Sequence, residues 1–200
     1  DGGHERIGGD VMSREAFWKV EVNPCAGGPE NKFFVQEYMS LGNGRAAIGQ
    51  VLYVGTYGDC CSLKDELDAG KLDRDAVWEN YLQKQFEGYN ATFSIYQLKD
   101  SMRARIYMSL SWIRSKCFLV ERKFYEIKYM DRLNEGDWNT WEEPLEEIYY
   151  KFNAAHPADY HGRSLSVSDV VVIRKDGQEK AYYCDTFGFE EVPEFVAGKL

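Results

Sequence analysis

The chain has 200 residues, of which 44% are hydrophobic, 28% charged and 15% aromatic. This is ordinary globular usage, and it excludes disorder along the whole chain. Lys and Arg number 24 against 33 Asp and Glu, and the resulting formal net charge of −9 argues against a general phosphate-backbone binder. The length suffices for one domain or two small ones, without a disulfide or metal to hold them together.

The first part of the chain reads as a small antiparallel meander followed by helices. Alternating or β-branched runs separated by Gly and Pro turns predict strands over 17–22, 33–39 and 46–57. Ser62 and Asp65 have the spacing of a capping box, which predicts a helix that starts there and stops near Gly70. A second helix is expected to begin at Asp73 or Asp75, because its apolar positions follow helical spacing up to Gly88.

The second part reads as a β-α-β-α-β-β unit that ends in a hairpin. Strands are predicted over 92–98, 123–130, 165–174 and 181–185, and Asp176-Gly177 is the hairpin turn. Apolar residues spaced by four, four and three predict a helix over 102–115, and Pro144 suits the first turn of another. The predicted fold class is therefore α+β, with a boundary near 88–91 that divides residues 1–90 from residues 91–200.

Three segments of the second part resemble a known family. They are YQLKD at 96–100, LEEIYYKFNAAHPADYHGRSLSVSDVVVI at 145–173 and AYYCDTFGFEEVPEF at 181–195. Together they resemble the YodL-like domain over about residues 92–197, a family of uncharacterised domains common on conjugative plasmids and transposons of Gram-positive bacteria. The resemblance implies a bacterial mobile element as the context, and no catalytic mechanism comes with it.

Two of these segments contain candidate motif residues. Ser164, Ser166 and Ser168 alternate with apolar residues, which predicts hydroxyls on one strand face. Asp169 interrupts this alternation, either as part of a Ser/Asp turn that fixes the strand entry or as part of a binding site. Near the end, Asp185 precedes a turn in which Gly188 is expected to need positive φ, with the rings of Phe187 and Phe189 packed on the hairpin.

No constellation in the sequence carries a specific chemical signature. Cys184 and His161 can be combined with Asp169 or Asp185 as a nucleophile set, but spacing alone does not identify a triad. The histidines and cysteines lack metal-ligand spacing, and no glycine-rich stretch has a phosphate-binding form. We therefore expect no catalytic residue, no metal and no cofactor.

The ends of the chain and its cysteines indicate a compartment. Residues 1–10 lack the apolar core of a secretory signal, and the longest apolar runs are too short for a membrane span. The chain starts with Asp instead of Met, so we expect it to be a piece of a longer polypeptide. Its five irregularly spaced cysteines are expected to be reduced thiols, which favours the cytoplasm and no membrane partner.

The charges are distributed unevenly. Acidic residues dominate 59–79 and 135–147, whereas 103–132 carries eight bases against three acids. Such a polarised molecule favours a matched protein partner, without direct binding of nucleic acid. The candidate interaction residues lie in the second acidic segment, where aromatic and acidic side chains alternate: Trp138, Trp141, Glu142, Glu143 and Glu146.

These observations predict a non-catalytic, cytoplasmic interaction or regulatory protein of a bacterial mobile element, with a bacterial protein as partner. One alternative is an acidic anti-defence inhibitor of the antirestriction type, in which carboxylates stand in for phosphates. The other alternative is an unrecognised Cys or Ser hydrolase.

Overall fold

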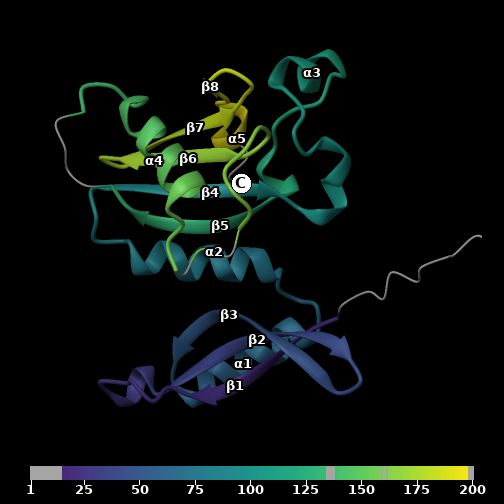
Figure 1. Ribbon diagram of the computed structural model, residues 1–200. Coiled ribbons are helices and arrows are strands. Elements are labelled where there is room, and N and C mark those ends of the chain that lie inside the picture. Colours follow the sequence, from purple (N-terminus) through teal and green to yellow (C-terminus); the bar gives the residue numbers. More distant parts are fainter. Residues whose placement is uncertain (1–14, 134–137, 159, 161, 198–200) are drawn as a thin grey trace, which may run out of the picture. The chain divides into compact units, whose positions relative to one another are not determined.

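The structure, a computed structural model, describes residues 15–133, 138–158, 160 and 162–197. The chain divides into two compact units, residues 1–81 and residues 82–200, and each contains an antiparallel sheet with helices (Figure 1). The α+β class and the N-terminal meander predicted from the sequence are confirmed. Within the described ranges, no helix has both the length and the apolar character needed to cross a membrane.

The first unit is a three-stranded sheet with α1 packed against it. Strands β1 (Ala16–Val22), β2 (Phe33–Gly42) and β3 (Arg45–Gly55) pair in that order, and α1 (Tyr57–Asp68) and α2 (Arg74–Gln85) follow. The small core joins sheet and helix through four buried side chains: Val35, Leu52, Cys60 and Leu67. A 3-10 turn, η1 (Pro29–Asn31), connects β1 to β2.

A polar network links β2 to the start of α2. The Arg74 guanidinium donates to both carboxylate oxygens of Glu37 at 2.8 and 2.7 Å, and to the Gln50 side-chain oxygen at 2.6 Å. Glu37 is almost fully buried, at 7% exposure. A buried carboxylate needs such a partner, because its transfer from water is costly unless it is paired and hydrogen-bonded.

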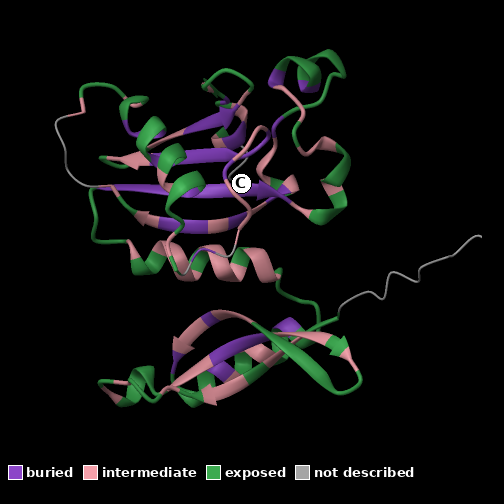
Figure 2. Cartoon of the chain, in the orientation of Figure 1, coloured by how far each residue is buried: buried purple, intermediate pink, exposed green. Residues whose placement is uncertain are grey.

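The second unit is a five-stranded antiparallel sheet with the order β5-β4-β6-β7-β8. Strand β4 (Ala91–Leu98), which pairs with β5 and β6, is buried at all eight positions, as the continuous purple in Figure 2 shows. The other strands are β5 (Tyr125–Arg132), β6 (Val170–Lys175), β7 (Gln178–Cys184) and β8 (Phe189–Glu191). Asp176 and Gly177 both have positive φ in the β6–β7 turn, so the predicted Asp-Gly hairpin is confirmed.

Helices cover both faces of this sheet. On one face, α4 (Glu143–Ala154) packs Leu145, Ile148 and Phe152 onto the side chains of β4, β6 and β7. On the opposite face, the short helix α5 (Glu194–Ala197) places Phe195 edge-on against Tyr96 and Tyr125. The sheet is therefore the hydrophobic centre of the unit.

Residues 99–124 contain two 3-10 turns and one short helix. They form η2 (Asp100–Arg105), α3 (Leu110–Ser115) and η3 (Arg122–Phe124). The prediction of one helix over 102–115 is wrong, because Ile106 is extended (ψ 135°) and Tyr107 has a φ of 67°. Helical spacing of the apolar residues was present, but the non-helical residues 106–109 interrupt the backbone.

Two other predicted boundaries are wrong for local reasons. Helix α1 begins at Tyr57 instead of near Ser62, because Thr56 caps it: its hydroxyl accepts from the Asp59 N–H and donates to the Asp59 carboxylate. Strand β6 begins at Val170, so 165–169 is not strand, and the expected row of serine hydroxyls on one strand face does not form. Ser168 instead has a φ of 86° in a turn.

Candidate functional site

The buried carboxylate of Asp169 is the centre of the polar structure that precedes β6. Its side chain has no exposed area, and Arg163 binds it with both guanidinium NH groups, one of them at 2.7 Å. It also accepts from the Ser166 N–H at 2.9 Å and from the Gln97 amide at 3.1 Å. Burial raises the pKa of Asp169 to about 7, although Arg163 and these hydrogen bonds act in the opposite direction.

Gln97 and Tyr160 complete this network around Arg163. The Gln97 amide group donates to the Arg163 carbonyl at 2.9 Å and accepts from the Arg163 N–H at 3.1 Å. The Tyr160 hydroxyl also donates to the Arg163 carbonyl. The network thus fixes both the backbone and the side chain of Arg163, and it connects the segment before β6 to the buried strand β4.

A second set of contacts holds residues 107–110 against the end of the sheet. The Tyr107 N–H donates to the Ser168 hydroxyl at 3.2 Å, and the Tyr183 hydroxyl donates to the Met108 carbonyl at 2.6 Å. The Leu110 N–H donates to Asp185 Oδ1 at 3.2 Å. Three backbone groups of one short segment are therefore bound by side chains of the β6 entry and of β7, which explains why the chain leaves helical geometry at Tyr107.

The residues considered for catalysis do not form an activated nucleophile. Cys184 is 3% exposed, and burial raises the pKa of its thiol to about 12, so the thiol is protonated at neutral pH. The His156 Nε2 atom is hydrogen-bonded to the Phe152 carbonyl and the Ser164 hydroxyl, and His161 lies outside the described residues. Among the residues whose placement is described, no group of three His, Cys, Asp or Glu could hold a metal ion.

The turn between β7 and β8 has one ring exposed and one ring packed. Gly188 has a φ of 80°, as predicted, and the Asp185 N–H donates to its carbonyl at 2.9 Å. The prediction that both rings pack on the hairpin is wrong for Phe187, which is 95% exposed. Phe189 does pack, and its ring meets Tyr149 of α4 edge-on with centroids 6.2 Å apart.

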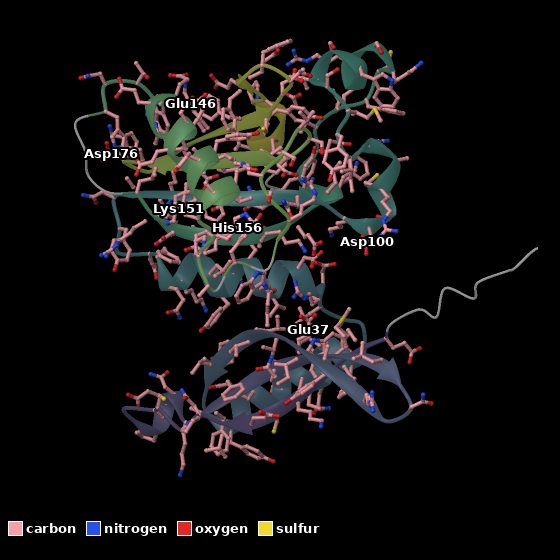
Figure 3. The ribbon with its side chains drawn as sticks, viewed as in Figure 1. Glu37, Asp100, Glu146, Lys151, His156 and Asp176 are labelled. Carbon is pink, nitrogen blue, oxygen red and sulfur yellow. The ribbon has the colours of Figure 1, made fainter. Side chains whose placement is uncertain are left out.

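This turn and α4 enclose a small open cavity of about 180 Å³. Its lining comes from α4 and from the end of β7 with the following turn: Glu146, Tyr149, Cys184, Asp185, Thr186, Gly188 and Phe189. Glu146 is an exposed residue of α4 (Figure 3). Two carboxylates and two aromatic rings therefore share one hollow.

The predicted interaction residues occupy two different environments. Glu142, Glu143 and Glu146 are exposed, and in the described part of the chain no Lys or Arg pairs with Glu143, Glu146 or their neighbour Glu147. Trp138 and Trp141 are partly buried against the core of the sheet. Lys175 and Lys180 lie over their rings, with the ammonium nitrogens 4.8 and 5.6 Å from the ring centroids.

Sequence reasoning missed the residues that bind Asp169 and the ring that is most exposed. Arg163, Gln97 and Tyr160 contact one another only because the fold brings residue 97 to the 160s. Phe187 gave no sign of exposure, since an aromatic residue next to a strand more often packs into the core. The turn at Gly188 could be predicted from the sequence. The sequence did not show which of the Phe187 and Phe189 rings would be exposed.

Comparison with known proteins gives one match. The model of the YodL-like domain family matches residues 92–195, which include every residue of the Asp169 network and of the cavity. No curated protein and no solved structure matches the chain.

Proposed function

The chain belongs to the YodL-like domain family, and on this premise we propose that it is a non-catalytic interaction protein of a bacterial mobile element, active in the cytoplasm. The family's common location on plasmids and transposons supports the context. All five cysteines are free thiols, which supports a reducing compartment. The absence of an activated nucleophile among the described residues supports a binding role.

One observation carries the binding role: Phe187 is 95% exposed in the β7–β8 turn, and its chain neighbours Thr186 and Gly188 line one cavity together with Glu146 of α4. We call this region the acidic surface and define it as Glu142, Glu143, Glu146, Tyr149 and Phe187. The cavity lined by both α4 and the β7–β8 turn shows that its two parts adjoin. An exposed ring costs free energy in water that contact with a partner recovers.

The chemistry of the surface indicates a basic protein partner. Two of its glutamates, Glu143 and Glu146, lack an ion pair within the described ranges, so a partner's Lys or Arg side chains can bind them without displacing a cation of this chain. Such charges mainly increase the association rate and select the partner, while the aromatic side chains provide affinity. In this proposal Trp138 and Trp141 do not contact the partner; they pack against the core and hold the chain that precedes α4 in place.

A pull-down from a Gram-positive lysate tests the proposal. Wild type is compared with Phe187→Ser and with the double variant Glu143→Lys, Glu146→Lys. The matched control is Ile48→Ser, which changes an apolar side chain that is 73% exposed in the other unit. We expect one captured protein, lost with both surface variants and retained with the control. A partner that all four proteins retain equally would place the interaction elsewhere.

A further inference from the structure

We propose that the cavity between α4 and the β7–β8 turn is a receptor for one guanidinium group, presented as an arginine side chain by the partner. The inference rests on the proposed function and specifies the chemistry that the acidic surface recognises. Its carboxylates are Glu146 and Asp185, and its aromatic walls are Tyr149 and Phe189.

Asp185 has acceptor capacity that the protein itself does not use. The N–H groups of Leu110 and Thr186 both donate to Oδ1, at 3.2 and 2.7 Å. Oδ2 forms no hydrogen bond within the described part of the chain. These contacts hold the carboxylate in place and leave one oxygen able to accept from a ligand.

Glu146 provides the second carboxylate from the opposite wall. It is exposed on α4 and has no ion-pair partner among the described residues. Both carboxylates also contribute, after burial and Asp169, to raising the pKa of the Cys184 thiol that lines the same cavity, whereas Arg163 acts in the opposite direction. A cation that enters the cavity therefore gains attraction from two sides.

The aromatic walls favour a planar cation over a spherical one. The rings of Tyr149 and Phe189 both line the cavity and pack edge-on against each other, at an interplanar angle of 84°. A guanidinium group stacks on aromatic faces and has five donors in a plane, enough for carboxylates on two sides. A volume of about 180 Å³ admits that group with its neighbouring methylenes.

The test uses the whole chain and two ligands that differ only in charge, N-acetylargininamide and N-acetylcitrullinamide. Binding is followed through the backbone amide resonances of Thr186, Gly188 and Phe189, which locate the ligand at the cavity. We expect saturable shifts at millimolar concentrations of the arginine derivative, weakened by added salt, and no shift with the citrulline derivative. Equal shifts with both ligands would overturn the proposal.

Two variants of neighbouring glutamates make the test specific. Glu146→Gln removes the charge that lines the cavity, and we expect the affinity to fall about threefold or more. Glu147→Gln makes the same change one residue later on α4, outside this cavity, and should leave the affinity within error. Equal losses in both variants would show a general charge effect and refute the site. If wild type captures no protein while ligand binding at the cavity is intact, the proposed function alone is refuted.

Discussion

Arg163 shows how much of this domain depends on a single side chain. It binds the wholly buried carboxylate of Asp169, and its own backbone is held by Gln97 and Tyr160. The cost of burying a carboxylate is offset only while this partner is present. The short segment before β6 is therefore stabilised by electrostatics, in contrast to the apolar strands that follow it.

Arg163→Met should destabilise the protein, and more so as the pH rises above neutrality. The pKa of Asp169 is raised to about 7 from an ordinary value of 3.8, so in wild type its contribution to stability falls between about pH 4 and 7. Without Arg163 the folded-state pKa rises further. At a pH between the folded-state pKa of Asp169 in wild type and that in the variant, the carboxyl of the variant still holds its proton and releases it on unfolding, whereas that of wild type is already ionised. The free energy of unfolding of the variant therefore falls by up to about 1.4 kcal/mol more per pH unit than that of wild type.

Urea denaturation at pH 6 and pH 8 measures this difference. For Arg163→Met we expect the free energy of unfolding to fall by about 1–3 kcal/mol at pH 6, because of the missing hydrogen bonds, and by more at pH 8. The control is Arg174→Met, because Arg174 donates to the Phe86 carbonyl and its loss should be nearly independent of pH. An Arg163→Met loss that is equal at both pH values would contradict a coupling to Asp169.

At the scale of elements, strands were easier to predict than the segment between β4 and β5. Alternation and turn residues located all the long strands, because a half-buried strand shows its faces directly in sequence. The segment 99–124 depends instead on distant side chains, which hold Tyr107 in a left-handed conformation. The cavity could not be predicted from the sequence for a similar reason, since α4 and the β7–β8 turn that line it are about forty residues apart in the chain.

Tyr183→Phe tests whether β7 holds the segment at 107–110. The change removes the hydroxyl that donates to the Met108 carbonyl, and it should cost about 1 kcal/mol. We also expect faster hydrogen exchange at the amides of Tyr107 and Leu110. Tyr182→Phe is the matched control, because the neighbouring hydroxyl donates to exposed Glu142 instead. If exchange at 107–110 increases equally in both variants, the Tyr183 hydroxyl does not anchor the segment.

Gly188→Ala tests the backbone of the β7–β8 turn. A Cβ at this position meets no atom within 4 Å, so any cost comes from the φ of 80° alone. We expect a loss of about 1–2 kcal/mol by urea denaturation. Gly88→Ala is the control, because its Cβ also enters open space and its φ is not in the left-handed region, so stability should change little. Equal effects of the two substitutions would contradict this account of the turn.

At the scale of the whole molecule, we propose that the two compact units, residues 1–81 and residues 82–200, fold separately. Each contains its own sheet, its own apolar core and its own buried ion pair. The sequence indicated this through a change of pattern near Gly88, but it could not show the ion pairs, since Arg74 and Glu37 are 37 residues apart. A cooperative unit normally requires a shared core.

Arg74→Met should therefore destabilise the first unit alone. The substitution leaves Glu37 buried without its partner, at a cost of about 2–3 kcal/mol, the lower part of the usual range because the Arg74 side chain is 22% exposed. Native-state hydrogen exchange should show lost protection in β2 and unchanged protection in β4 and β6. Arg163→Met should give the reverse pattern. Equal loss of protection in all three strands, in either variant, would mean that the chain unfolds as one cooperative body.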